Sequence, residues 1–241
     1  MNRPETLGEV VAGVDAIVFT LGSDGQGSRG AVTIDYGGVR NVLTALNGAG
    51  PRIALMTSIG VTNRDSSDNR SSHAHDWKRR SERLVRASGL DYTIVRPGWF
   101  DYNAAGQQQI VMIQGDTRHS GSPADGAVAR RQIARVLVGS LIAAAANRKT
   151  FEVTADGAEQ ADLEPVFAAL DADNSASLDD VRDTRASLSR PSRKAFVRTS
   201  LPGERRRHST RRVVGQVHAD QLHRWLVARE RIGGEVLGRV Q

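Results

Sequence analysis

The stretch HDWKRRSERLVRASGLDYTIVRPGWF, residues 75–100, decides how this chain folds. Its spacing predicts a helix, a two-residue turn, a strand at DYTIVRP (91–97) and then Pro-Gly. The apolar face of the helix carries Trp77, Leu84 and Val85. Lys78 lies one turn into the helix. Whether Lys78 serves a ligand or is a solvated charge decides whether the chain reads as an enzyme.

Strand and helix patterns alternate on both sides of this stretch. The other strand patterns are VDAIVFT (14–20), RIALMTS (52–58) and FEVTA (151–155). The other helix patterns are IDYGGVRNVLTALNGAG (34–50) and the run marked by Ile133, Val136, Leu137 and Leu141. Continuously apolar strands that alternate with helices are typical of a parallel sheet covered on both faces. The sequence therefore predicts an α/β fold, part of a doubly wound parallel sheet.

Composition narrows the class of protein. The chain has 241 residues, 39% of them hydrophobic, and no cysteine, which excludes disulfides and thiolate chemistry. The N-terminus lacks the apolar stretch of a secretory signal. The longest apolar run, VLVGSLIAAAA at 136–146, is shorter than the roughly 20 residues of a membrane helix. We expect a cytoplasmic protein with no membrane partner.

Charge divides the chain into a body and a tail. Residues 185–241 hold 14 Lys/Arg against 4 Asp/Glu, whereas the rest of the chain is mildly acidic. We therefore expect a domain at 1–170, followed at 171–241 by an acidic turn and a disordered basic tail. Phe196 and Trp225 are the tail's only aromatic residues for stacking on bases, so nucleic acid is not the favoured partner. A shifted reading frame in a GC-rich gene would also produce such a tail.

Parallel sheets of this kind bind ligands beyond the carboxyl ends of their strands. Three such ends carry Thr20-Leu21-Gly22-Ser23, Thr57-Ser58 and Arg96-Pro97-Gly98. Hydroxyl groups can hydrogen-bond a ligand there, and Pro-Gly lets the backbone approach it closely. Serine and glycine also end strands without any function, so spacing alone leaves both interpretations open.

Three motifs in this order resemble a known superfamily. The chain is similar to short-chain dehydrogenases/reductases in three motifs: TSIGVT (57–62), Lys78 with Glu82 four residues later, and SGLDYTIVRPGWF (88–100). The resemblance is to the atypical, NAD(P)H-binding branch, with its NmrA-like and flavin-reductase-like proteins, and covers roughly residues 9–170. It implies a Rossmann-like fold, NADP or NAD as cofactor, and a small-molecule substrate.

The resemblance also implies roles for individual residues. Ser58 matches the catalytic serine of the superfamily, Lys78 matches the lysine of its Tyr-x-x-x-Lys pair, and Pro97-Gly98 flanks the nicotinamide. The cofactor-binding set that follows is Thr20, Gly22, Ser23, Thr57, Lys78, Arg96, Pro97 and Gly98.

One departure concerns the acid–base residue. Ala74 stands where the superfamily has its tyrosine, and alanine cannot transfer a proton. His73 and His75 lie beside it and could supply a proton near neutral pH, although histidines in a polar loop are mostly solvated. Tyr92 and Tyr102 could approach from other elements, but packing roles are favoured for them. No third ligand accompanies the two histidines, so we expect no metal site.

A second departure concerns the pyrophosphate-binding turn. GQGSRG (25–30) alone has the Gly-x-Gly-x-x-Gly spacing, and the next strand ends without the acid that accompanies this motif. We interpret GQGSRG as a flexible loop after the superfamily's fourth strand. The resemblance then implies that three strands, on the order of 55–75 residues, would precede Met1. VDAIVFT would be an exposed edge strand, which favours a homo-oligomer.

The segment FAALDADNSASLDDVR (167–182) resembles half of a calcium-binding EF-hand loop. Ala176 and Arg182 replace the required glycine and the bidentate acid, so we expect an acidic turn without calcium. The sequence as a whole predicts an NAD(P)-dependent oxidoreductase that transfers hydride to a small carbonyl, quinone, flavin or sugar. The alternatives are a non-catalytic NADP-sensing regulator and a protein that binds nucleic acid through the tail.

Overall fold

The computed structural model describes residues 3–174 and 177–183 and has a five-stranded sheet at its centre. The strand order is β1-β2-β3-β7-β5, in which the first four strands run parallel and β5 is antiparallel to β7. The strands are β1 (Ala16–Phe19), β2 (Arg52–Met56), β3 (Tyr92–Pro97), β7 (Lys149–Asp156) and β5 (Gln109–Ile113). The predicted α/β fold with a mainly parallel, Rossmann-like sheet is confirmed.

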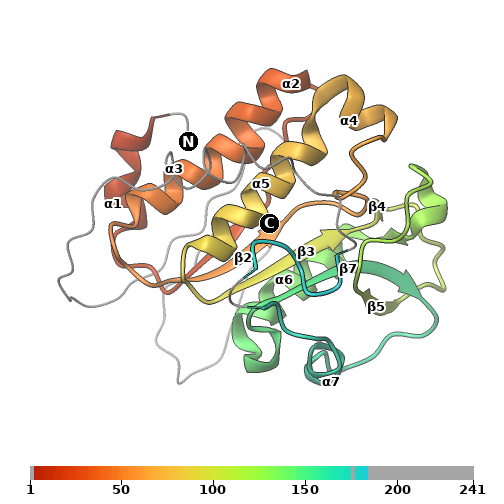
Figure 1. Cartoon of the computed structure of the whole chain (residues 1–241). Helices are drawn as coiled ribbons and strands as arrows, with labels where there is room; N and C mark the ends of the chain where they lie inside the picture. Colours follow the sequence, from red (N-terminus) through yellow and green to blue (C-terminus); the bar gives the residue numbers. More distant parts are fainter. Residues whose placement is uncertain (1–2, 175–176, 184–241) are drawn as a thin grey trace, which may run out of the picture.

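Helices cover both faces of this sheet (Figure 1). One face packs against α1 (Leu7–Val11), α3 (Gly37–Ala45) and α5 (Ala74–Ala87), and the other packs against α6 (Arg130–Ile142) and α7 (Glu164–Ala168). Each face has its own apolar core. All six residues of β3 are buried, because a central parallel strand is covered from both sides.

The helix predicted at 34–50 is part of a longer helical run. It begins with α2 (Gly27–Gly30), continues through a π-helical segment (Ala31–Tyr36) and ends with α3. The last four residues of GQGSRG are therefore helical, so the prediction of a flexible loop was wrong for them. A Cβ atom at Gly30 would lie 2.5 Å from Cβ of Gln26, so glycine permits close packing at this position.

Several elements carry no clear signal in the sequence. They are β5, the two-stranded sheet of β4 (Trp99–Phe100) and β6 (Ala127–Val128), α4 (Ser67–Ser72), and the short 3-10 turns Pro4–Thr6, Pro123–Asp125 and Ala144–Ala146. α4 forms inside a polar loop because the Ser66 hydroxyl caps it, accepting the N–H of Asn69. In the described part of the chain no helix is long and apolar enough to cross a bilayer. The predicted tail at 185–241 lies outside the described residues.

Candidate functional site

Lys78 points into the molecule toward the carboxyl end of β1. Its Nζ donates a hydrogen bond to Oδ1 of Asp35 at 2.7 Å and lies 3.4 Å from the carbonyl oxygen of Leu21, just after β1. The Lys78 side chain is 17% exposed and that of Asp35 is fully buried. A crossover helix starts near the carboxyl ends of the strands it joins, which explains why the first turns of α5 reach this edge. Lys78 is therefore not a freely solvated charge.

Asp35 is a site residue that the sequence interpretation missed. It lies in the π-helical segment, and the Ser81 hydroxyl of α5 donates to its backbone carbonyl at 2.6 Å. Its second carboxylate oxygen, Oδ2, is buried and has no hydrogen-bond partner among the described residues. The only signal in the sequence was that Asp35 is the single acidic residue of the predicted helix at 34–50. A carboxylate there fixes the ammonium group of Lys78 in place.

Ser58 follows β2 and its hydroxyl oxygen is buried without a hydrogen-bond partner among the described residues. The loop after it is held firmly. Asp116 accepts the N–H of Gly60 at 2.6 Å and the N–H of Thr62 at 2.7 Å. The N–H of Ile59 donates to the carbonyl of Pro97 at 2.9 Å. A hydroxyl without a partner on a fixed loop is available to a ligand.

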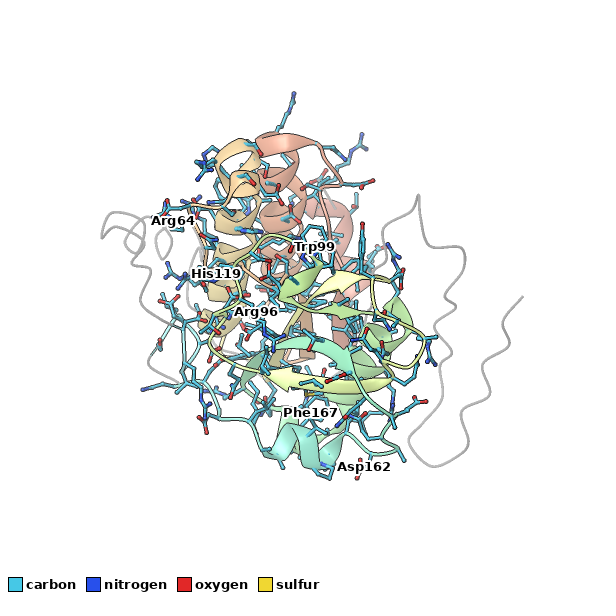
Figure 2. The ribbon with its side chains drawn as sticks, turned by 90° about the vertical axis from the view of Figure 1, so that its right-hand side faces the viewer. Arg64, Arg96, Trp99, His119, Asp162 and Phe167 are labelled. Carbon is cyan, nitrogen blue, oxygen red and sulfur yellow. The ribbon has the colours of Figure 1, made fainter. Side chains whose placement is uncertain are left out.

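Thr57 and Arg96 both bind Glu82 inside the molecule. The Thr57 hydroxyl lies 2.8 Å from Oε1 of Glu82, and Arg96 donates to both carboxylate oxygens at 3.0 and 2.8 Å. Burial acts to raise the pKa of Glu82, but the guanidinium groups of Arg96 and Arg86 outweigh it and lower that pKa to about 2. Figure 2 shows Arg96 near the middle of the molecule. These two side chains tie α5 to the sheet, and their assignment to cofactor binding stays a prediction.

The other predicted positions lie at the same edge of the sheet with different surroundings. Thr20, Gly22 and Ser23 form a half-exposed loop after β1, and a Cβ at Gly22 would meet nothing within 4 Å. A Cβ at Gly98, by contrast, would lie 2.3 Å from the carbonyl oxygen of Gly126. Close backbone packing thus explains the glycine after Pro97 without a ligand.

The residues around Ala74 offer no tyrosine. Ala74 is the first residue of α5, and His73 before it has φ 56° and contacts the Ser28 hydroxyl at 2.9 Å. His75 lies 3.3 Å from the Ser66 hydroxyl, and burial lowers the pKa of its imidazole. Neither Tyr92 nor Tyr102 replaces the missing residue: the Tyr92 hydroxyl donates to Asp173 at 3.0 Å, and Tyr102 is 65% exposed. The described residues contain no cluster of three or more metal-ligand side chains.

Comparison with known proteins identifies the family. The model of the NAD(P)H-binding family matches residues 1–144, more than half of the chain. The chain belongs to the NAD(P)H-binding family. The uncharacterized sugar epimerase YhfK of Bacillus subtilis is 27% identical over 155 residues, which cover 64% of this chain and 69% of YhfK. The UPF0659 protein YMR090W of Saccharomyces cerevisiae is 33% identical over 98 residues, which cover 39% of this chain and 43% of that protein.

A solved structure supports the fold. A Bacillus halodurans protein assigned as an NAD-dependent epimerase/dehydratase superposes with a TM-score of 0.53 at 23% identity, covering 69% of this chain and 73% of that one. The family match confirms the predicted NAD(P)H-binding protein, with NAD or NADP as the cofactor. Three features fit the nicotinamide-ribose part of this cofactor by their chemistry. They are the ammonium group of Lys78, the loop at Gly22 with open space for a ligand, and the Ser58 hydroxyl, which has no described partner.

Proposed function

We propose that this protein transfers hydride between NAD(P) and a small carbonyl, quinone, flavin or sugar substrate. The observation that carries the proposal is the Lys78–Asp35 pair, which fixes an ammonium group at the carboxyl end of β1 beside the open loop 20–23. When bound there, the nicotinamide supplies the hydride acceptor or donor. The likeness to YhfK, a protein named as a sugar epimerase, favours the sugar class among these substrates.

The chain's own residues have distinct roles in this proposal. Lys78 donates hydrogen bonds to the ribose hydroxyls and keeps its orientation through Asp35. Ser58 donates its hydroxyl proton in a hydrogen bond to the substrate oxygen, as a buried donor that has no partner in the described part of the chain can do. Ala74 stands at the position of the proton-transferring tyrosine and cannot transfer a proton, so the proton must come from another group.

The alanine at position 74 also favours a second candidate function. A chain that binds NADP without an acid–base residue suits a regulator that senses the cofactor and does not turn it over. Turnover separates the two functions. If NADPH binds but is not oxidised by carbonyl, quinone or flavin acceptors, the protein is a binder, and Ser58→Ala has no effect. If it is oxidised, Ser58→Ala should leave affinity unchanged and lower turnover by roughly tenfold or more.

NADPH binding to Lys78→Met tests the site itself. We expect weak binding to the unaltered chain, in the high-micromolar range, because the one Gly-x-Gly-x-x-Gly spacing in the sequence, GQGSRG, lacks the acid that accompanies a pyrophosphate-binding turn. Methionine keeps the unbranched stem and removes the charge, so affinity should fall by roughly ten- to a hundredfold, which corresponds to a charged hydrogen bond of about 1.5–3 kcal/mol. Saturation-transfer NMR, which detects weak complexes, measures this.

Arg80→Met is the matched control, since Arg80 lies on the same helix with its guanidinium over the ring of Trp77, whereas the described ion pair of Asp35 is with Lys78. Its affinity for NADPH should equal that of the unaltered chain. Equal affinity of Lys78→Met, or no NADPH binding at all, would show that the Lys78–Asp35 pair serves only the fold.

A further inference from the structure

Residues 171–183 fold back across α5 and β7 as an acidic segment, of which residues 171–174 and 177–183 are described. Asp173 anchors its first part. It binds Arg86 of α5 at 3.1 Å, the hydroxyl of Thr150 at 2.7 Å and the hydroxyl of Tyr92. The turn that follows brings three more aspartates against a row of arginines.

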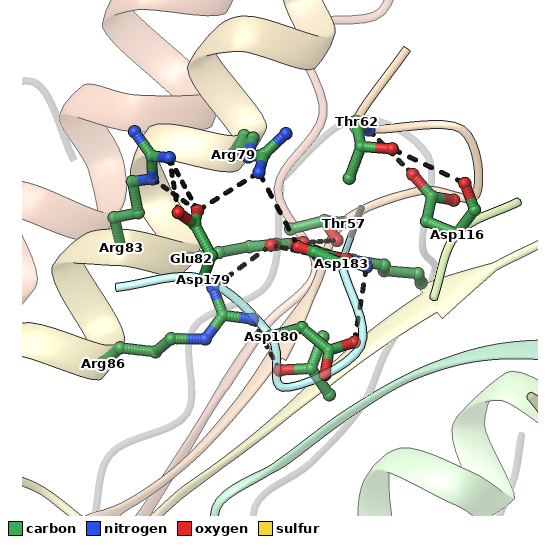
Figure 3. Close-up of polar contacts among 12 residues, drawn as sticks. Thr57, Thr62, Arg79, Glu82, Arg83, Arg86, Asp116, Asp179, Asp180 and Asp183 are labelled. Atoms are coloured by element: carbon green, nitrogen blue, oxygen red, sulfur yellow. Dashed lines mark hydrogen bonds and ion pairs between the residues drawn. The ribbon is translucent and has the colours of Figure 1, made fainter. Parts of the chain in front are cut away.

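Two of these aspartates lie side by side on three guanidinium groups (Figure 3). Arg83 binds both oxygens of Asp179 at 2.8 Å, and Arg96 binds both oxygens of Asp183 at 2.7 and 3.0 Å. Arg79 lies between them, 3.2 Å from Asp179 and 3.8 Å from Asp183. Two adjacent carboxylates are thus each held by a two-pronged guanidinium contact, and Arg79 contacts both of them.

Arg79 has more donors than the acidic segment uses. The residue is 1% exposed, yet its Nε and Nη1 have no hydrogen-bond partner in the described structure. Buried guanidinium N–H groups without an acceptor are costly, and an acceptor with more oxygens than a carboxylate would satisfy them. The cluster is open to solvent at Asp179, whose side chain is 36% exposed, whereas Arg79, Arg96 and Asp183 are buried.

The arginines depend on the acidic segment for neutralisation. Arg79, Arg83, Arg86 and Arg96 face only two acidic side chains from the rest of the described body, Glu82 and Glu152. Burial raises the pKa of Glu152 to about 8, so it is mostly protonated at neutral pH. Without the segment, a strongly positive surface would remain, which attracts anions.

We propose that Arg79, Arg83 and Arg96 form a binding site for a diphosphate group, and that Asp179 and Asp183 occupy it as internal ligands. Guanidinium forks recognise phosphate oxygens with the same geometry as carboxylate oxygens. A diphosphate presents two linked anionic groups, as the two aspartates do, and supplies extra oxygens for Nε and Nη1 of Arg79. The tethered aspartates compete at high effective concentration, so an external ligand must displace them.

Hydrogen exchange of the full chain tests this, with inorganic pyrophosphate as the probe. Displacement of Asp179 and Asp183 should speed amide exchange in residues 177–183 by roughly tenfold. Monophosphate, and sodium chloride at equal ionic strength, should have much smaller effects. Arg79→Gln should abolish the difference between pyrophosphate and chloride, whereas Arg80→Gln, the neighbour outside the cluster, should keep it.

Calorimetry of the double variant Asp179→Asn/Asp183→Asn gives a second measurement. Removing the competing charges should tighten pyrophosphate binding by roughly tenfold or more. The basic residues of 185–241 will also bind pyrophosphate, so the difference between variants is the readout, and circular dichroism confirms folding. If pyrophosphate and chloride speed exchange equally, the cluster is a permanent internal ion-pair network and the proposal is wrong. Neither measurement contains NAD(P), so the outcome is independent of the proposed function.

Discussion

Glu152 lies on β7 with its carboxyl group between Arg96 and Asp116. Oε1 is 3.3 Å from Nη1 of Arg96, and Oε2 accepts the N–H of Asp116 at 3.1 Å. Burial raises the pKa of Glu152 to about 8, because it outweighs the attraction of Arg96 and because Asp116 is also negatively charged. Glu82, bound to the same arginine, shifts the other way. At the scale of single residues, one buried guanidinium thus keeps one carboxylate ionised and leaves another protonated.

The raised pKa of Glu152 predicts that stability falls as pH rises. Between the ordinary carboxyl pKa and about 8, the folded protein holds a proton on Glu152 that the unfolded chain has released. Rising pH therefore favours the unfolded state. The free energy of unfolding should drop by on the order of 1–3 kcal/mol between pH 5 and 8.5. Glu152→Gln should flatten this dependence, and the exposed Glu9→Gln should not. Urea unfolding at several pH values measures it; equal slopes for both variants would contradict the shift.

At the scale of elements, Gly98 joins β3 to the small sheet of β4 and β6. Its N–H donates to Val153 on β7, while its Cα faces the carbonyl of Gly126 before β6. The chain can make this junction only where a side chain is absent. The Pro-Gly pattern is therefore explained by the packing of one backbone on another.

Gly98→Ala should destabilise the fold. The added Cβ would lie 2.3 Å from the Gly126 oxygen, so backbone must move, at about 1–3 kcal/mol or more. Gly22→Ala is the matched control, since its Cβ would enter open space and should change stability by less than about 0.5 kcal/mol. Thermal and urea unfolding measure both. A neutral Gly98→Ala would mean that the close approach to Gly126 does not exist in solution.

β1 is the edge strand of the described sheet, since it pairs with β2 alone. Apolar edges recruit other strands, so we expect the purified chain to be larger than a monomer in light scattering. Ala16→Lys puts a charge on this strand at a partly exposed position and should shift the population toward monomer. Val138→Lys places the same charge on an exposed position of α6 and should not. Monomeric unaltered protein would rule out association through β1.

At the scale of the whole molecule, the acidic segment completes the body. Its aspartates pair with Arg79, Arg83, Arg86 and Arg96. The rest of the described body supplies only Glu82 and Glu152 to these four arginines. The predicted boundary at residue 170 separates the segment from these partners. We expect the body to depend on this segment for its stability.

Two shortened chains decide this point. A chain that ends at Asp183 should unfold with nearly the free energy of the full chain. A chain that ends at Leu170 should lose about 3–5 kcal/mol or more, because breaking buried ion pairs leaves charges without partners. Urea unfolding at one pH and salt concentration compares them. Equal stability of the two chains would show that residues 171–183 add nothing to the body.

The sequence by itself determined the four parallel strands β1, β2, β3 and β7 and the helices α3, α5 and α6. Residues 52–56 and 92–97 are apolar runs, and the helix at 74–87 has an apolar stripe, so burial alone dictates where they lie. It also placed Ser58 and Lys78 near the carboxyl edge, because the ends of parallel strands meet there. α4 and β5 could not be predicted, since a side-chain cap and an antiparallel partner, with no period in the sequence, stabilise them.

Tertiary structure alone decided which charges meet. Lys78 and Asp35 are 43 residues apart, and Arg79 and Asp179 are 100 apart. A charged residue on a helix has the same local pattern whether water or a distant carboxylate surrounds it. Burial makes the difference, because a guanidinium or ammonium group removed from water requires a counter-charge, and only the folded chain brings that group within reach.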